Sequence, residues 1–298
     1  MIDDAEKKIF TVTKARKAGE IKTIGEVMRT TQEHLERLAK NQAEITGIAT
    51  GFYDFDKLTS GLHENELIII AARPAMGKTA FGLNIAINSA INSKKPVAIF
   101  NMEMSAEQLA LRMIASVGGI DMNKLKTGKL EHNDWKKVNE AMSQLGETDI
   151  YLEDSSGITV SEIRAKCRRL ATSDKGLGLV IIDYLQLING SARYAGNRQQ
   201  EVAEISRSLK TMAMELKIPV IALAQLSRSV ELRENKRPIM SDLRESGSIE
   251  QDADIVAFLY RDDYYNKPKE KTNVSLTELI IGKHRNGSTG TNELVFEG

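Results

Sequence analysis

The chain has 298 residues but only one cysteine and four histidines, and both scarcities exclude classes of protein. The single Cys167 cannot form an internal disulfide. It shares one helical face with Ile163 and Leu170, so we expect it in the core and not as a nucleophile. The histidines are scattered without ligand spacing, which argues against a zinc site.

Long apolar runs and a net charge are also absent. No apolar run is long enough to span a bilayer, and the first ten residues, MIDDAEKKIF, lack the apolar region of a signal peptide. We therefore expect a soluble, cytoplasmic protein that has no membrane partner. Lys+Arg and Asp+Glu both number 41, so no global field draws the chain to nucleic acid. Any polyanion site must be a local basic patch, or one patch repeated by symmetry.

Hydrophobic residues make up 41% of the chain, which is enough to bury a large core. From residue 67 onward, apolar runs of strand length alternate with helical patterns, which predicts a mostly parallel sheet flanked by helices. The expected strands are 67–71, 97–101, 149–153, 177–188, 219–226, 255–260, 276–282 and 292–296, and the expected helices are 78–92, 106–117, 133–145, 160–172 and 200–217. Ser105 with Gln108 and Thr159 with Glu162 form capping-box patterns that mark two of the helix starts.

The segment before this core has a different pattern. Helical spacing of apolar residues predicts short helices at 3–18 and 24–40, and the first is too short to be stable without something to pack against. Residues 47–62 are punctuated by glycine and serine and indicate turns. We place a domain boundary between 1–45, a helical linker, and 46–298, the core domain.

The sequence LIIIAARPAMGKT, residues 67–79, joins a buried strand to a helix through a loop of small residues. Unpartnered backbone amides at a helix start, with the helix dipole, favour an anion there. Lys78 supplies a cation for phosphate and the Thr79 hydroxyl is placed to ligate Mg²⁺. The strict phosphate-loop pattern, G-x-x-x-x-G-K-[ST], has glycine where this chain has Ala72. The methyl group of alanine is tolerated there if φ stays negative. The predicted ATP-binding loop comprises Ala72, Arg73, Pro74, Ala75, Met76, Gly77, Lys78 and Thr79.

Three polar residues end other predicted strands, at the edge where open α/β sheets bind ligands. Asp183 ends the apolar run LVIID and is the expected second holder of Mg²⁺ beside Thr79. Glu103 follows the strand at 97–101 and is placed to polarise a water for attack on the γ-phosphate. Gln225 ends the strand at 219–226, where a neutral amide can sense the γ-phosphate.

Six motifs occur in one order: AARPAMGKT, NMEMS, LVIIDYLQL, IALAQLSR, SDLRESGSIEQDADIV and IGKHRNG. Together they resemble the RecA-like motor domain of the DnaB family of replicative helicases, over nearly the whole chain. The resemblance implies a RecA-like P-loop NTPase fold with a short N-terminal helical linker. It also implies a homohexameric ring with ATP and Mg²⁺ bound between subunits, and alanine at position 72 is usual in this family.

The resemblance assigns further residues. Arg285, with Lys283 beside it, matches the family's arginine finger, which reaches the γ-phosphate bound by the adjacent subunit. By itself, KHRNG would more often be a solvated basic hairpin. Arg244, Glu245 and Gly247 match the loop that meets successive phosphates of single-stranded DNA. A weaker second candidate for DNA contact is the loop that carries Arg193, Tyr194 and Arg198.

The expected function is an ATP-dependent helicase that moves 5′ to 3′ on single-stranded DNA, a polarity that comes wholly from the resemblance. Family members usually begin with a helical collar domain, and this chain begins at what matches the linker helix, so a fragment or a short relative is expected. Primase and a helicase loader are the expected protein partners. Two alternatives remain open: a RecA-type recombinase, which forms filaments, and an ATP-gated DNA-binding scaffold without productive turnover.

Overall fold

The computed structural model describes residues 21, 23–41, 45–190, 194, 196–266 and 274–297. The chain divides into two compact units, Met1–Thr46 and Gly47–Gly298. The helix predicted at 3–18 lies outside the described residues. The assignment of a linker at 1–45 and a motor domain at 46–298 stays a prediction.

In the first unit, the predicted second helix is present as α2, Ile24–Asn41. It begins with a reciprocal cap, in which the Thr23 amide donates to Glu26 Oε2 and the Glu26 amide donates to Thr23 Oγ1. Among the described residues of this unit, the side chains of Ile24, Met28 and Leu35 are 71%, 61% and 59% exposed.

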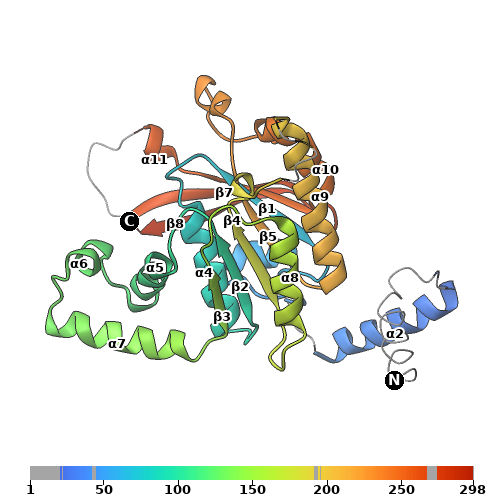
Figure 1. Ribbon diagram of the computed structural model, residues 1–298, viewed down its shortest axis with the longest axis horizontal. Helices are drawn as coiled ribbons and strands as arrows, with labels where there is room; N and C mark the ends of the chain where they lie inside the picture. Colours follow the sequence, from blue (N-terminus) through green and yellow to red (C-terminus); the bar gives the residue numbers. More distant parts are fainter. Residues whose placement is uncertain are drawn as a thin grey trace, which may run out of the picture. The chain divides into compact units, whose positions relative to one another are not determined.

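The second unit is built around one sheet that contains every strand of the described residues (Figure 1). Its strands are β1 Leu67–Ala72, β2 Val97–Asn101, β3 Ile150–Glu153, β4 Leu179–Asp183, β5 Val220–Gln225, β6 Ile255–Tyr260, β7 Val274–His284 and β8 Gly290–Glu297. The order is β3-β2-β4-β5-β1-β6-β7-β8. Neighbouring strands from β3 to β6 pair in parallel, while β7 and β8 are antiparallel. The predicted mostly parallel sheet is therefore confirmed, with β1 in its interior.

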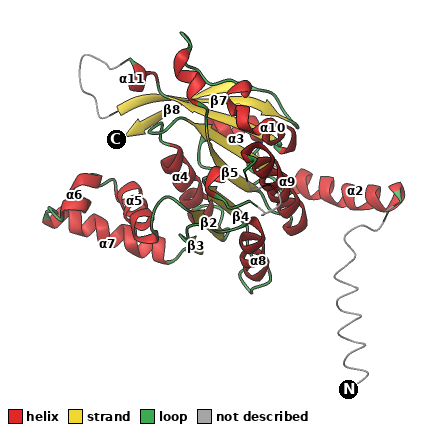
Figure 2. Cartoon of the chain, turned by 45° about the horizontal axis from the view of Figure 1, so that its top comes forward, coloured by secondary structure: helices red, strands yellow, loops and turns green. Residues whose placement is uncertain are grey.

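Helices such as α4 Lys78–Ile91 and α9 Arg198–Leu216 cover the two faces of this sheet (Figure 2). The other helices of this unit are α3 Tyr53–Thr59, α5 Ala106–Gly118, α6 Met122–Thr127, α7 His132–Gly146, α8 Val160–Ala171, α10 Gly247–Asp252 and α11 Asp262–Tyr265, with 3₁₀ helices η1 Leu185–Leu187, η3 Arg228–Leu232 and η4 Met240–Ser246. The predicted caps at Ser105 and Thr159 both form. No helix in the described parts of the chain is long and apolar enough to cross a membrane.

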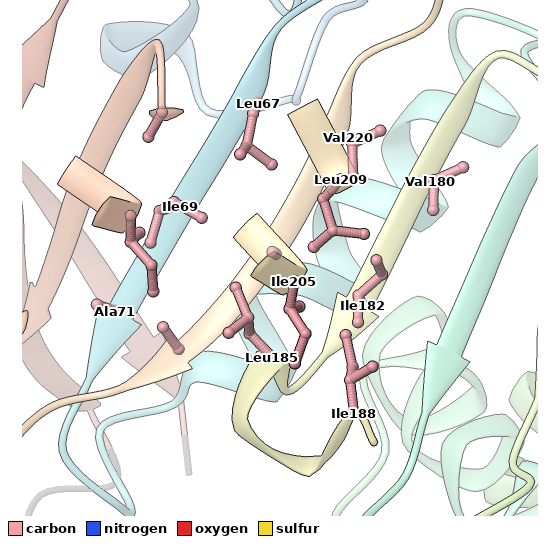
Figure 3. Close-up of a cluster of buried hydrophobic side chains, with 14 of the residues drawn as sticks. Leu67, Ile69, Ala71, Val180, Ile182, Leu185, Ile188, Ile205, Leu209 and Val220 are labelled. Atoms are coloured by element: carbon pink, nitrogen blue, oxygen red, sulfur yellow. The ribbon is translucent and has the colours of Figure 1, made fainter. Parts of the chain in front are cut away.

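Strand β1 contributes alternate side chains to two cores. Leu67, Ile69 and Ala71 pack with α8 and α9, in the cluster that Figure 3 shows. Ile68 and Ile70 face the other way and pack with α3, α4 and α5. All six residues of β1 are buried, so both faces of the sheet fix the strand that leads into the phosphate loop. Cys167 is fully buried on α8, as predicted.

Two sequence predictions about the fold are wrong. The strand predicted at 177–188 ends at Asp183 and is followed by η1. Leu185 in that turn and Ile188 directly after it remain buried, so the apolar run reflects burial and not strand length. The turns predicted at 47–62 contain the helix α3, which the core holds through the fully buried Phe55. Helices α6 and α11 were not predicted, because both are short.

Candidate functional site

The predicted phosphate loop joins the carboxyl end of β1 to the first turn of α4. Ala72 is the last residue of β1 and has no positive φ, as its methyl group requires. Gly77 precedes α4 with φ of 92°, a conformation that favours glycine. Ala75 also has a positive φ, 65°, which the sequence did not indicate. The first amides of α4 have no intrahelical partner, so this turn is suited to an anion.

The two side chains at the start of α4 meet the end of β4. The Thr79 hydroxyl donates to Asp183 Oδ2 over 2.6 Å, and Lys78 Nζ lies 3.9 Å from Asp183 Oδ1. Asn101, the last residue of β2, donates its side-chain amide to Asp183 Oδ2 over 3.1 Å. Three parts of the chain therefore converge where the sequence placed the site, and Asn101 is a member that sequence reasoning missed. Its signal was a polar residue at the end of a buried strand.

The Asp183 carboxylate fits the role of a metal holder. Its side chain is 3% exposed, and Oδ1 is a buried acceptor without a hydrogen-bond partner in the structure. A buried carboxylate oxygen without a hydrogen bond is costly, even with Lys78 Nζ 3.9 Å away, and a hard cation with its water shell is one group that satisfies it. The chemistry of Thr79 and Asp183, two oxygen donors beside a phosphate loop, fits Mg²⁺.

Lys78 is held in a largely dehydrated position. Its side chain is 12% exposed, and Nζ lies 4.4 Å from the centroid of the Tyr184 ring. Burial lowers the pKa of Lys78 from its ordinary value of 10.5, while the negative charges of Asp183 and Glu103 oppose that shift. Tyr184 is another member of the site that sequence reasoning missed, although it follows Asp183 directly.

The depressed pKa of Lys78 predicts a pH dependence of nucleotide binding. A bound phosphate favours the charged amine, so affinity should be full below the pKa of the free protein and fall as pH rises through it. Because that pKa lies below 10.5, the decline should begin at lower pH than for an ordinary lysine. Calorimetric titration at alkaline pH, in buffers of different ionisation enthalpy, should show proton uptake on binding. Proton release on binding would contradict the view that Lys78 takes up a proton when nucleotide binds. So would the absence of proton uptake in the pH range where the affinity falls.

Glu103 and Gln225 both lie at the predicted edge of the sheet. The exposed Glu103 follows β2, and its amide donates to Asn101 Oδ1 over 2.9 Å. Gln225 ends β5 in register with Ala72 of the phosphate loop. Its backbone is clamped by Gln186, which donates to the Gln225 carbonyl and accepts from the Gln225 amide, each over 3.1 Å. The roles of both residues toward the γ-phosphate stay predictions.

Arg285 and Lys283 lie at the opposite edge of the sheet from the phosphate loop of their own chain. The Arg285 guanidinium donates to Asp254 Oδ1 over 3.3 Å, and Asp254 Oδ2 accepts the amide of Leu67, the first residue of β1. The phosphate loop begins at the other end of this six-residue strand, roughly 17 Å away at about 3.3 Å per residue. Lys283 donates to the carbonyls of Glu250 and Ala253, near the end of α10. Arg285 therefore cannot serve the site of its own chain in this structure.

The predicted DNA-binding residues follow one another along the backbone. Arg244 and Glu245 belong to η4, and Gly247 begins α10. Of the second candidate loop, Arg193 lies outside the described residues, and Arg198 is engaged within the chain by Glu201, over 2.8 Å, and by the Gln186 carbonyl. Contact of either loop with DNA stays a prediction.

A cavity of about 650 Å³ lies beside the phosphate loop, between α4, α5 and β8. Its lining includes Met76 and Gly77 of the loop, and Phe296 of β8. A Cβ atom added at Gly77 would lie 2.9 Å from the Phe296 ring, so a side chain there would have to displace this ring. The Arg261 guanidinium stacks over the same ring at 4.2 Å. Arg261 and Phe296 are additions that no sequence pattern indicated.

Comparison with known proteins places this site in a family. Residues 47–298 match the model of the DnaB-like helicase C-terminal domain. The chain is 56% identical to the replicative DNA helicase DnaB of Geobacillus stearothermophilus and 54% identical to the replicative DNA helicase DnaC of Bacillus subtilis strain 168. Each alignment covers 99% of this chain and 64% of the relative, so the chain spans less than two thirds of these relatives' length.

Solved structures agree with this placement. The structure of a separate ATPase domain matches with a TM-score of 0.86 and 41% identity, over 93% of this chain and 96% of that one. A DnaB-like replicative helicase, solved in a study of its interactions with primase, matches with a TM-score of 0.82 and 39% identity, over 98% of this chain and 69% of that one. The predicted RecA-like fold is confirmed, and the chain belongs to the family of DnaB-like helicase C-terminal domains.

Proposed function

We propose that this chain is the motor of an ATP-dependent cytoplasmic DNA helicase, which hydrolyses ATP with Mg²⁺ between subunits of a homohexameric ring. The energy of hydrolysis moves the ring 5′ to 3′ on single-stranded DNA and unwinds the duplex by excluding the other strand. Family membership and the relatives named as replicative helicases support this function. Primase is a proposed partner because a similar helicase was solved in a study of its interactions with primase. A helicase loader is proposed from the family resemblance alone.

One observation carries the proposal: Arg285 lies at the edge of the sheet opposite the phosphate loop of its own chain. If Arg285 is the finger, each complete site needs a second copy, because roughly 17 Å, five steps of about 3.3 Å along β1, separates the two parts within one chain. Hydrolysis at such a site is coupled to the arrangement of neighbouring subunits, as a ring motor requires.

Each residue of the site has a proposed task. The loop of Ala72 to Thr79 holds the triphosphate, and Lys78 neutralises its β- and γ-phosphates. Thr79 and Asp183, which meet through a 2.6 Å hydrogen bond, would hold Mg²⁺, and the ion would neutralise charge on the phosphates. Glu103 orients and deprotonates the attacking water, and Gln225 senses the γ-phosphate. Arg285, with Lys283 beside it, reaches the γ-phosphate of the neighbouring copy.

DNA is proposed to contact Arg244, Glu245 and Gly247. Arginine offers a fork of donors to phosphate, and the backbone at glycine can approach closely. Base edges are not read, so binding tolerates any sequence. With roughly six subunits that each neutralise about one phosphate, log K against log salt has a slope near −4 on a single strand.

Forked duplexes test the proposal directly. With ATP and Mg²⁺, the protein should unwind a fork that carries a 5′ tail, leave one with only a 3′ tail intact, and hydrolyse ATP faster with DNA present.

Arg244→Ala should weaken DNA binding and make the slope of log K against log salt shallower, because each subunit loses a phosphate contact. Open filaments that pair homologous DNA without unwinding would favour a recombinase. DNA binding without turnover would favour a scaffold.

A further inference from the structure

Arg73, the second residue of the phosphate loop, binds the segment that follows β5. Its side chain is 9% exposed; Nη1 donates to the Leu226 carbonyl over 2.8 Å and Nε donates to Glu231 Oε1 over 2.9 Å. The Leu226 amide in turn donates to the Ala72 carbonyl over 3.1 Å. The loop is therefore tied from both sides to the residue directly after Gln225. A buried guanidinium without these acceptors would be strongly unfavourable, so the tie is expected to persist as the loop moves.

The same segment is tied to the predicted DNA-binding loop. The Ser227 amide donates to the Asp242 carbonyl over 3.1 Å. The Asp242 carboxylate, 4% exposed, accepts both Nη groups of Arg233, over 3.0 and 2.7 Å, and the Ile239 amide over 2.8 Å. Asp242 belongs to η4 and stands two residues before Arg244. Two sets of contacts thus connect the phosphate loop to the predicted DNA-binding loop. In the first step, Arg73 binds the segment 226–231, and in the second step, the segment 227–233 binds Asp242.

These contacts differ from surface ion pairs in their geometry. The Arg233–Asp242 pair is bidentate, and its carboxylate is almost fully buried, so it fixes direction as well as distance. Arg73 uses two different nitrogens on two acceptors, one of them a backbone carbonyl. A displacement of the phosphate loop would therefore reach the backbone near Leu226 and would not be absorbed by rotation of the Arg73 side chain.

We propose that Arg73 with Glu231, and Arg233 with Asp242, form a mechanical link that transmits the nucleotide state of the phosphate loop to the DNA-binding loop. The proposal rests on the proposed function, because it needs ATP at the first loop and DNA at the second. These four are positioning residues: they act through the loops and do not touch the reacting atoms. Such coupling is measured as the ratio of the DNA affinities in two nucleotide states. Loss of a contact that only stabilises the fold would leave this ratio unchanged.

Glu231→Ala is the main test, since this carboxylate is 39% exposed and Arg73 keeps the Leu226 carbonyl as an acceptor when it is removed. The affinity for a fluorescent oligodeoxythymidine is measured with a non-hydrolysable ATP analogue and with ADP, and the ratio of the two is the coupling. Allosteric ratios are commonly about 5 to 150. Glu231→Ala should bring the ratio at least about fivefold closer to one when each nucleotide is present at a saturating concentration. Glu231→Gln, which keeps an acceptor oxygen, should recover part of the ratio.

Asp242→Asn weakens the second step, and Glu234→Ala, an exposed carboxylate of the same segment, is the matched control. Because the two steps act in series, the double variant Glu231→Ala with Asp242→Asn should couple no worse than the poorer single variant. Unchanged coupling in Glu231→Ala, additive losses in the double variant, or an equal loss in Glu234→Ala would overturn the proposal. If Asp242→Asn does not fold, Glu231→Ala against Glu234→Ala decides alone.

Arg244→Ala separates failure of this inference from failure of the proposed function. If it weakens DNA binding in both nucleotide states while Glu231→Ala leaves the ratio intact, the DNA-binding loop stands and only the link is wrong. If Arg244→Ala leaves DNA binding unchanged, the loop assignment itself is wrong and the link has no endpoint. A wild-type ratio of one would also overturn the link.

Discussion

Arg285→Ala should lower the ATPase rate about 10³- to 10⁵-fold, the range found for arginine fingers, while ATP still binds. The guanidinium is expected to stabilise charge that develops on the γ-phosphate in the transition state, so the loss should be in kcat and not in nucleotide affinity. Steady-state ATP hydrolysis and binding of a fluorescent ATP analogue measure the two separately.

The structure supplies the controls for this variant. Arg285 pairs with Asp254 in its own chain, but Asp254 also accepts Lys210 over 2.6 Å and the Leu67 amide over 2.8 Å. The fold should therefore survive, with little change in the thermal unfolding midpoint. Arg237→Ala is the matched control, because its side chain is 47% exposed against 44% for Arg285, and it too forms an ion pair. An equal loss in both variants would point to a general structural effect.

Glu103→Gln should lower the rate about 10²- to 10⁴-fold, the usual contribution of a general base. The amide keeps the size of the side chain but cannot accept the proton of the attacking water. Glu103 is exposed and its backbone is fixed by Asn101, so the substitution should leave both fold and ATP binding intact. Single-turnover hydrolysis isolates the chemical step from product release.

Glu107→Gln, at an exposed carboxylate in the first turn of α5, is the control for Glu103→Gln. It removes a charge near the same helix without a proposed role in chemistry. A rate in Glu103→Gln within about twofold of wild type would show that another group takes the proton, since a general base contributes at least about 10². DNA-stimulated hydrolysis that Glu103→Gln abolishes would count against a scaffold without turnover.

Much of the sheet could be predicted because its strands are buried on both faces and read as apolar runs. The bounds of β2 and β6 agree with the predicted strands 97–101 and 255–260 to the residue. The same signal failed at 184–188, where burial continues but the backbone turns into η1. The helix α3 was not predicted, because the glycine and serine residues around it indicated turns. The buried side chain of Phe55 holds this helix against the core.

The candidate site divides in the same way. The sequence predicted that Thr79 and Asp183 lie close together, because the carboxyl ends of parallel strands share one edge of the sheet. The 2.6 Å hydrogen bond between their side chains agrees with this prediction. Tyr184 and Arg73 were missed as partners of Lys78 and Glu231, because such contacts join residues far apart in sequence and no spacing announces them. The place of Arg285 at the far edge of the sheet likewise depends on the antiparallel return of β7.

Mixing two inactive variants tests the central claim, that ATP is hydrolysed at a site shared by two copies of the chain. Lys78→Ala lacks the phosphate-binding lysine but keeps Arg285, and Arg285→Ala keeps a complete phosphate loop. In rings assembled at random from equal amounts, about a quarter of the interfaces join an intact loop to an intact finger. The ATPase rate of the mixture should therefore rise above either variant alone and peak near equal proportions, whereas no recovery at any ratio would show that each site is built within one chain.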